Sequence, residues 1–190
     1  MHSLVVQIID SRKELPMKYK KIIEQNCMVN AIISANLEDA FLSIEELEPD
    51  LIIMSDSACE NVNEICAEIR SKTRISRPVI VVLSKSSYLD DKLSALGAGA
   101  DDFLSEPIDQ SEFSARIFAH LRRQVEELSN PITELAPAQI TYKMLKRAIK
   151  SNKDWALMYI DIDNFDDYKE IYGELASSRM LQSFTSILTS

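Results

Sequence analysis

Short apolar runs alternate with amphipathic stretches through the first two thirds of the chain. The runs are rich in β-branched residues, as buried strands are, and lie at residues 4–9, 28–33, 51–54, 78–83 and 103–104. Apolar residues at helical spacing follow the runs, at about 13–25, 37–47, through Ile65 and Ile69, and at about 88–96 and 110–128. Since apolar strands that alternate with helices build a parallel sheet covered on both faces, the pattern predicts an α/β fold with a doubly wound five-stranded sheet.

The pattern changes near residue 126, where the last of these helices runs on as a connector. Asn130-Pro131 ends the connector helix, because a proline disfavours helix at the residue before it. The remaining sequence predicts a helix over 138–150, a strand over 155–160 and two more helical stretches. We therefore expect three parts: a domain over 1–125, a helical connector over 126–137 and an incomplete α/β unit over 138–190, because one strand is too few for an independent sheet.

Composition narrows the classes of function. The 190 residues carry a net charge of −9, which argues against a broad nucleic-acid footprint, and no apolar run approaches the roughly 20 residues of a membrane helix. Three glycines are too few for a glycine-rich phosphate loop, and two histidines leave little material for serine–histidine catalysis or histidine metal sites. The three cysteines lack a metal-ligand spacing and are interpreted as reduced thiols, which, without a signal peptide, predicts a cytoplasmic protein.

Polar residues end four of the predicted strands. They are Asp10 and Ser11 after the first strand, Ser55 and Asp56 after the third, Ser84 and Lys85 after the fourth, and Glu106 and Pro107 after the fifth. Ligands of open parallel sheets bind at the carboxyl ends of the strands, so we expect the functional pocket to lie there.

Three segments around these positions carry a resemblance to a known family. They are Pro49-Asp50-Leu51-Ile52-Ile53-Met54, Pro78-Val79-Ile80-Val81-Val82-Leu83-Ser84 and Gly97-Ala98-Gly99-Ala100-Asp101-Asp102-Phe103-Leu104-Ser105-Glu106-Pro107. Through them the first 125 or so residues resemble a response-regulator receiver domain. The resemblance implies a receiver-like (flavodoxin-like) sheet with the strand order 2-1-3-4-5.

Several residues of the implied phosphorylation pocket depart from the family pattern. Receivers carry an acidic pair after strand one, a phosphoacceptor aspartate after strand three, a serine or threonine after strand four and a lysine-proline after strand five. The matching residues here are Asp10 with Ser11, Ser55, Ser84 and Glu106. A serine cannot form an acyl phosphate, and the glutamate brings negative charge where phosphoryl oxygens need a cation. Loss of one carboxylate weakens magnesium binding, so we expect no firm cofactor and at most a weak Mg²⁺ site.

Asp56 offers an alternative phosphoacceptor if the register shifts by one residue. Neighbouring strand residues point to opposite faces, so such a shift turns the side chain away, and we favour a degenerate pocket over phosphorylation of Asp56. Phe103 matches the aromatic residue that rotates when a receiver is activated. Ordinary core or interface packing is an equally good interpretation of Phe103.

The C-terminal segment carries a second resemblance. Residues 130–135 (Asn-Pro-Ile-Thr-Glu-Leu) resemble the opening of GGDEF diguanylate cyclase domains, and residues 155–165 resemble the first strand and metal-binding turn of that family. Tyr172-Gly173 matches an aromatic-glycine pair of the same family. Together these motifs indicate the N-terminal part of a GGDEF-like domain.

The second resemblance implies site residues that are only partly kept. Asp161 matches the family's metal-binding aspartate, whereas the guanine-binding asparagine and aspartate fall on Lys169 and Ser178. An alternative is that Asp161 and Asp163 cap the following helix, where carboxylates are favoured. We favour the capping alternative for this chain.

Together the features predict a regulatory signalling protein: a pseudo-receiver that acts by protein–protein contact, without phosphorylation, on a GGDEF-type output. We expect a homodimer through the face of helix four, strand five and helix five, and neither nucleic acid nor membrane as a partner. The expected interface stripe comprises Phe113, Ile117, Leu121 and Leu128. We expect no enzymatic activity from this chain. Two alternatives stay open: a fragment of a diguanylate cyclase that makes cyclic dimeric GMP from GTP, and a phosphorelay receiver that uses Asp56.

Overall fold

The chain divides into two units, Met1–Gln124 and Val125–Ser190. The computed structural model describes residues 4–26, 29–73, 77–127, 130, 132–133, 135, 138–150 and 154–188. The first unit holds the candidate site, and the two units are considered one at a time.

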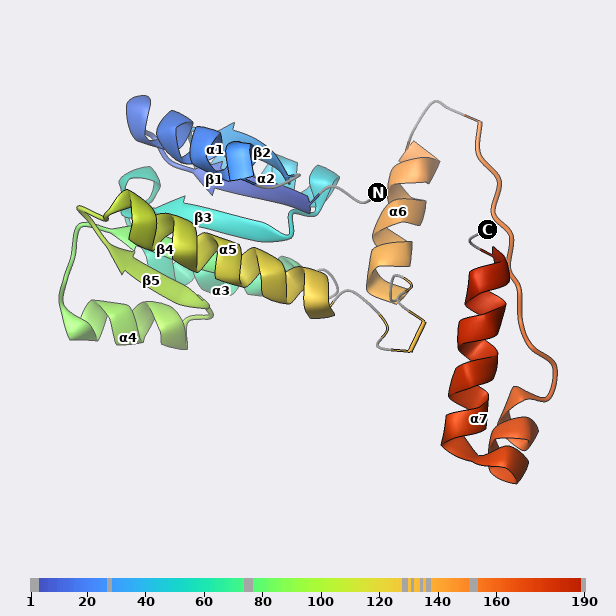
Figure 1. Ribbon diagram of the computed structural model, residues 1–190. Coiled ribbons are helices and arrows are strands. Elements are labelled where there is room, and N and C mark those ends of the chain that lie inside the picture. Colours follow the sequence, from blue (N-terminus) through green and yellow to red (C-terminus); the bar gives the residue numbers. More distant parts are fainter. Residues whose placement is uncertain are drawn as a thin grey trace. The chain divides into compact units, whose positions relative to one another are not determined.

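A five-stranded parallel sheet in the order β2-β1-β3-β4-β5 forms the centre of the first unit (Figure 1). Its strands are β1 (Leu4–Ile9), β2 (Val29–Ser34), β3 (Leu51–Ser55), β4 (Val79–Ser84) and β5 (Asp102–Ser105). Its helices are α1 (Glu14–Asn26), α2 (Leu37–Leu47), α3 (Val62–Lys72), α4 (Leu89–Gly97) and α5 (Gln110–Glu127), with a short 3-10 turn, η1 (Asp56–Ala58). The predicted fold class and strand order are confirmed.

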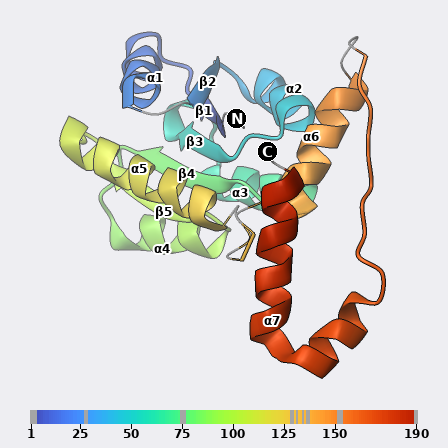
Figure 2. The same ribbon diagram turned by 45° about the vertical axis from the view of Figure 1, so that its right-hand side comes forward.

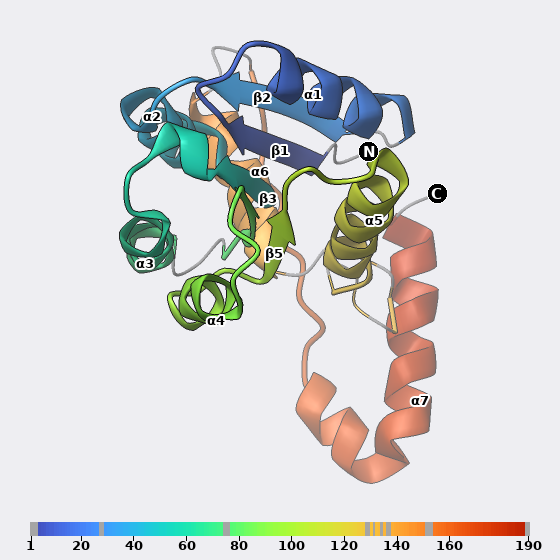
Figure 3. The same cartoon turned by 90° about the vertical axis from the view of Figure 1, so that its left-hand side faces the viewer.

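Helices cover both faces of the sheet, which explains why the strands are apolar on both sides. Helices α1 and α5 lie on one face and α2, α3 and α4 on the other (Figure 3). On the first face Tyr19 of α1 stacks on Phe113 of α5, with the ring centroids 4.2 Å apart. On the second face Ile44 of α2 and Ile69 of α3 join Met54 of β3 in the core. A sheet buried in this way presents only its strand ends to ligands.

The apolar stripe of α5 belongs largely to the core. Phe113 and Ile117 are 0% exposed and Leu121 is 3% exposed. Side chains that are already buried in one chain have no apolar area left for a partner, so the prediction that these three residues form the dimer interface is wrong. Leu128, the fourth residue of the predicted stripe, lies outside the described residues.

The second unit contains helices α6 (Ala138–Lys150) and α7 (Phe165–Leu188). Helix α7 is bent, as Figure 2 shows, and the residue with non-helical backbone is Gly173, at φ 81° and ψ 172°. The predicted strand over 155–160 is not formed, since residues 154–162 have neither helix nor strand structure. A strand needs a neighbour for its backbone hydrogen bonds, and the described residues of this unit provide none.

Among the described residues, no helix has the length and apolar character needed to cross a membrane.

Candidate functional site

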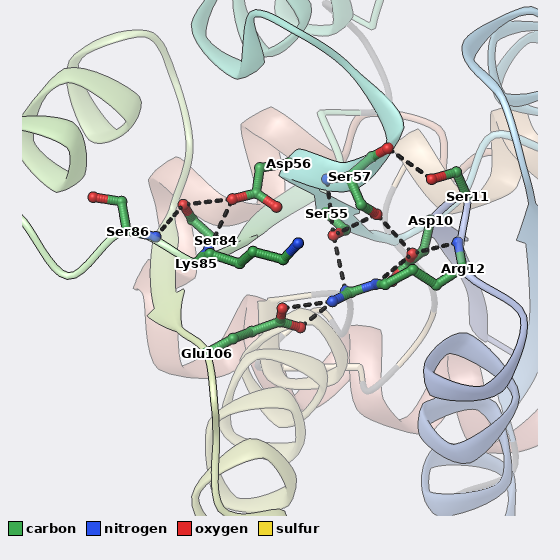
Figure 4. A network of polar contacts seen from close by, with 10 residues as sticks. All are labelled: Asp10, Ser11, Arg12, Ser55, Asp56, Ser57, Ser84, Lys85, Ser86 and Glu106. Carbon is green, nitrogen blue, oxygen red and sulfur yellow. Dashed lines mark hydrogen bonds and ion pairs between the residues drawn. The ribbon is translucent and has the colours of Figure 1, made fainter.

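The carboxyl ends of β1, β3, β4 and β5 bring the predicted pocket residues to one edge of the sheet (Figure 4). Strand register aligns Ser55 of β3 with Leu83 of β4, next to Ser84. Asp10 follows β1 directly, and its backbone N–H donates to the Ser34 carbonyl at 3.0 Å. The backbone N–H of Glu106 donates to the Ser84 carbonyl at 2.7 Å, which fixes the chain at the end of β5.

Arg12, which the strand-end pattern did not single out, lies in the middle of this edge. Its Nη1 donates to Glu106 Oε2 at 2.6 Å, and its Nη2 donates to Glu106 Oε1 at 2.9 Å. Its Nε donates to Asp10 Oδ1 at 2.9 Å, and Nη2 also donates to Asp10 Oδ2 at 2.7 Å. A further bond of 2.9 Å runs from Nη2 to the Ser55 hydroxyl. The guanidinium thus binds two carboxylates through paired bonds, the geometry in which arginine binds carboxylates best.

The charges in this network are shielded from water. The side chain of Asp10 is 0% exposed, that of Glu106 is 10% exposed and that of Arg12 is 23% exposed. Burial acts to raise the pKa of Asp10, but hydrogen bonds from Arg12 and Ser57 outweigh it, and the pKa lies below its ordinary value. Hydrogen bonds to Asp10 and Glu106 raise the pKa of Arg12 further. Arg12 is therefore a permanent cation inside the pocket.

Three serine hydroxyl groups make further hydrogen bonds beside the Arg12 network. Ser57 Oγ donates to Asp10 Oδ1 at 2.8 Å and lies 2.9 Å from Ser55 Oγ. Ser11 Oγ donates to the Ser57 carbonyl at 2.7 Å. The two hydroxyls at the carboxylate positions of the family pattern, Ser11 and Ser55, thus serve structural hydrogen bonds within the pocket.

Asp56 joins a different set of contacts from its neighbour Ser55. Its Oδ2 accepts a 2.9 Å bond from the Ser84 hydroxyl and a 2.8 Å bond from the backbone N–H of Lys85 (Figure 4). The division follows from the backbone, because Ser55 is the last residue of β3 and Asp56 is the first of η1. The pocket therefore contains two networks, one around Arg12 and one around Asp56.

The comparisons with known proteins agree with this architecture. Residues 6–118 match the family model of the response regulator receiver domain. The chain belongs to the response regulator receiver family. Residues 116–190 match the family model of the diguanylate cyclase GGDEF domain, so the receiver is followed by part of a GGDEF domain.

Relatives and solved structures support the same assignment. The chain is 30% identical over 125 residues to the transcriptional regulatory protein YvrH of Bacillus subtilis, covering 65% of this chain and 51% of that protein. It is 44% identical over 80 residues to the response regulator ArlR of Staphylococcus epidermidis, covering 41% of this chain and 35% of that protein. A crystal structure of a two-component response regulator from Clostridium difficile is similar, with 27% identity, a TM-score of 0.58, and coverage of 64% of this chain and 98% of that one. The chain thus spans about half or less of the length of these two curated relatives.

The residues of this receiver do not fit the magnesium ion that the family pattern implies. Asp10 is engaged by Arg12 and Ser57, and the second carboxylate position is Ser11, whose hydroxyl acts as a donor. Within the part of the chain that the structure describes, no cluster of three or more His, Cys, Asp or Glu residues could hold a metal ion. Magnesium prefers hard, anionic oxygen ligands with free lone pairs, and here the guanidinium occupies them.

Phe103, the predicted switch aromatic, is 6% exposed and belongs to the receiver core. It lines a cavity of about 210 Å³ together with Val82, Ser84 and Ala95, among others. The cavity lies beside the Asp56 network, because Ser84 borders both.

Among the described residues of the second unit, the predicted site residues do not form a cluster that could hold a metal ion. Asp161 is exposed, and its Oδ1 accepts a 3.0 Å bond from the Ile162 N–H. Asn164 directly precedes α7, and its carbonyl accepts from Tyr168 N–H at 3.0 Å. Neither Asp161 nor Asp163 therefore holds the N-cap position, which corrects the capping interpretation.

The two degenerate nucleotide positions both lie on α7. Lys169 Nζ pairs with Glu174 at 2.8 Å, and this hydrogen bond, with the charge of Glu174, raises the pKa of Lys169. Ser178 is half-buried in the same helix. The positions that would read a guanine thus hold a lysine engaged in an ion pair and a short hydroxyl.

Proposed function

We propose that this two-component signalling regulator contains a pseudo-receiver that works without phosphorylation and acts on a GGDEF-type output. The observation that carries the proposal is the Arg12 guanidinium bound between Asp10, Ser55 and Glu106. Receiver phosphorylation needs a carboxylate nucleophile, a metal ion and a cation that is free to meet the phosphoryl oxygens. In this pocket the nucleophile position is a serine, and the guanidinium of Arg12 is neutralised by two carboxylates.

Asp56 is the one carboxylate at the end of β3 that offers a competing acceptor. Its Oδ2 is held by Ser84 and Lys85, on the side of the pocket away from the Arg12 network. Phosphoryl transfer to such an acceptor requires charge neutralisation by a metal ion, and the residues of this pocket do not fit one. We therefore propose that Asp56 is not phosphorylated.

Intact-mass spectrometry after incubation with acetyl phosphate or phosphoramidate and magnesium tests this proposal. We expect no gain of a phosphoryl group. A hydroxylamine-labile gain that disappears in Asp56→Asn, and stays in the matched loop variant Glu60→Gln, would instead establish a phosphorelay receiver that uses Asp56.

We infer that the output of the pseudo-receiver is contact with a second copy through the α4–β5–α5 face. Since the α5 stripe is buried, the apolar surface of this face lies on α4, where Tyr88 is 76% exposed, Leu89 is 66% exposed and Leu93 is 56% exposed. Leu89 and Leu93 are four residues apart and so share one side of the helix. Exposed apolar residues grouped on one helix are typical of contact surfaces.

Sedimentation velocity tests the dimer. Wild type at tens of micromolar should sediment as a dimer, and Leu93→Asp should be a folded monomer, because a buried unpaired charge costs several kcal/mol. Leu42→Asp is the matched control, since Leu42 of α2 is 57% exposed and lies on a different surface. A monomeric wild type, or a dimer that Leu93→Asp leaves intact, contradicts this interface.

Diguanylate cyclase activity is a second candidate, favoured by the match of residues 116–190 to the GGDEF family model. The chain contains no Gly-Gly-Asp/Glu-Glu-Phe run, and its metal position is a single exposed aspartate, Asp161. We therefore propose that this chain is not itself a cyclase, and that the second unit transmits the state of the receiver. A cytoplasmic location completes the proposal.

A further inference from the structure

A chain of hydrogen bonds runs from the end of β3 to the start of α4. Asp56 Oδ2 accepts from the Ser84 hydroxyl at 2.9 Å and from the Lys85 N–H at 2.8 Å. Ser84 Oγ in turn accepts from the Ser86 N–H at 3.0 Å (Figure 4). Ser84, Lys85 and Ser86 lie at the end of β4 and directly after it. The carboxylate of Asp56, which follows β3, therefore reaches across to the neighbouring strand.

The chain of bonds continues into the first turn of α4. Ser86 Oγ accepts from the Tyr88 N–H at 3.2 Å and donates to the carboxylate of Asp91. Tyr88 is the N-cap residue of α4, and its side chain makes no capping hydrogen bond. Helix starts leave backbone N–H groups without intrahelical partners, and Ser86 satisfies one of them, the N–H of the N-cap residue itself.

We propose that the Asp56 carboxylate is a built-in anionic anchor that fixes residues 85–88 and thereby the start of α4. The carboxylate accepts two bonds at one oxygen, and bonds to an ionised acceptor are about twice as strong as neutral ones. Ser84, through which the anchor acts, is 7% exposed, so water competes weakly for its hydroxyl.

The orientation of the Ser84 hydroxyl couples its hydrogen bond to Asp56 with the hydrogen bond that it accepts from Ser86. Because its proton points to Asp56, its lone pairs face the Ser86 N–H, and linked hydrogen bonds of this kind strengthen one another. Without an acceptor at residue 56, the hydroxyl is free to turn and the segment loses both bonds to the carboxylate. The pocket thus sets the conformation of the helix that carries Tyr88 and Leu89, whether or not that helix binds a second copy.

Amide hydrogen exchange on the full chain tests the anchor. In Asp56→Ala, backbone amides of residues 85–92 should exchange about tenfold faster than in wild type, which corresponds to the loss of about 1.4 kcal/mol of local stability. Exchange in β1 and β2 should be unchanged. Asp56→Asn should restore only part of the protection, since its amide oxygen accepts the same two bonds but carries no charge. Glu45→Ala, an exposed carboxylate of α2, should match wild type.

Ser84→Ala approaches the same contact from the other side and covers the case in which Asp56→Ala does not fold. It should loosen residues 85–92 to a similar degree, and the double variant should add little, because both substitutions break one network. Exchange in this segment within about twofold of wild type in Ser84→Ala overturns the proposal. An increase shared equally by β1 and β2 overturns it as well, because it shows general destabilisation in place of a local anchor.

Discussion

At the pocket, one arginine faces two carboxylates that would otherwise repel each other. The guanidinium of Arg12 binds Asp10 and Glu106 through five hydrogen bonds between 2.6 and 3.2 Å. Buried ion pairs of this kind contribute little net stability compared with apolar residues, but removing one partner leaves the other charge buried and uncompensated. Loss of either Arg12 or Glu106 therefore leaves charge in the pocket without its partner.

Substitution of Arg12 should expose this dependence. We expect Arg12→Ala to lower the free energy of unfolding by about 3 kcal/mol in urea titrations, because Asp10 and Glu106 lose their only shared cation in the described pocket. Arg12→Lys should lose less, since it keeps the charge but not the paired geometry. The exposed neighbour provides the control: Lys13→Ala should stay within about 0.5 kcal/mol of wild type. A loss below about 1 kcal/mol in Arg12→Ala contradicts the pairing.

The loss of stability in Arg12→Ala should depend on pH in a definite direction. The pKa of Asp10 is lowered in the folded protein, so its ionised form stabilises the fold above its unfolded pKa of about 4, and this stabilisation is lost as pH falls through the lower folded pKa. In Arg12→Ala burial acts without the arginine and raises the pKa of Asp10 instead. The difference in unfolding free energy between wild type and variant should therefore shrink as pH falls from about 6 to about 3, and a constant difference rules this account out.

Residue positions at the strand ends could be predicted from the sequence, but their partners could not. Asp10, Ser55, Ser84 and Glu106 lie at one edge because a parallel sheet aligns its carboxyl ends. Arg12 was not predicted as a pocket residue, because it lies in the loop after β1 and its long side chain reaches back across the strand ends. Two charges in the sequence could have indicated the pairing: Glu106 stands where a cation is expected, and Arg12 lies two residues after Asp10.

At the scale of elements, the secondary-structure prediction was confirmed where the pattern within one segment is enough to specify the element. Strands buried on both faces and helices with an apolar side form from patterns within one segment, and those of the receiver appear where the sequence places them. The run at 155–160 has the same strand pattern, but the described residues of its unit offer no neighbouring strand, so the pattern alone did not suffice. The stripe on α5 was ambiguous for a related reason, because one helical pattern serves a core and an interface equally well.

Two glycines near the end of α4 give a matched test at this scale. Gly99 has φ +111°, and a Cβ there would lie 2.8 Å from Cγ of Arg70, whereas a Cβ at Gly97 meets nothing within 4 Å. We expect Gly99→Ala to lower the free energy of unfolding by about 1–3 kcal/mol, through strain and displacement of Arg70. Gly97→Ala, at the last residue of the helix, should be neutral or stabilise by up to about 1 kcal/mol. Equal losses in urea titrations of the two variants would refute this explanation.

At the scale of the whole molecule, the two units differ in how completely they bury their apolar residues. In the receiver, β1 and β3 are buried along their whole length. In the second unit Leu157 is 66% exposed, Met158 is 80% exposed and Tyr159 is 88% exposed. This segment therefore lacks a packing partner among the described residues. Contiguous exposed apolar residues of this kind are typical of contact surfaces.

The same incompleteness leads us to expect no cyclase activity from this chain. Cyclic dimeric GMP synthesis from GTP requires metal ions held by several carboxylates against the nucleotide phosphates. Here Asp161 is exposed and the described residues offer no metal-binding cluster around it, while Lys169 is paired with Glu174. With GTP and magnesium or manganese, product should stay at the level of a no-protein control, and Asp161→Asn should behave as wild type does. Product formation that Asp161→Asn abolishes would show that residues 125–190 already form a working metal site, and the chain would then be an enzyme.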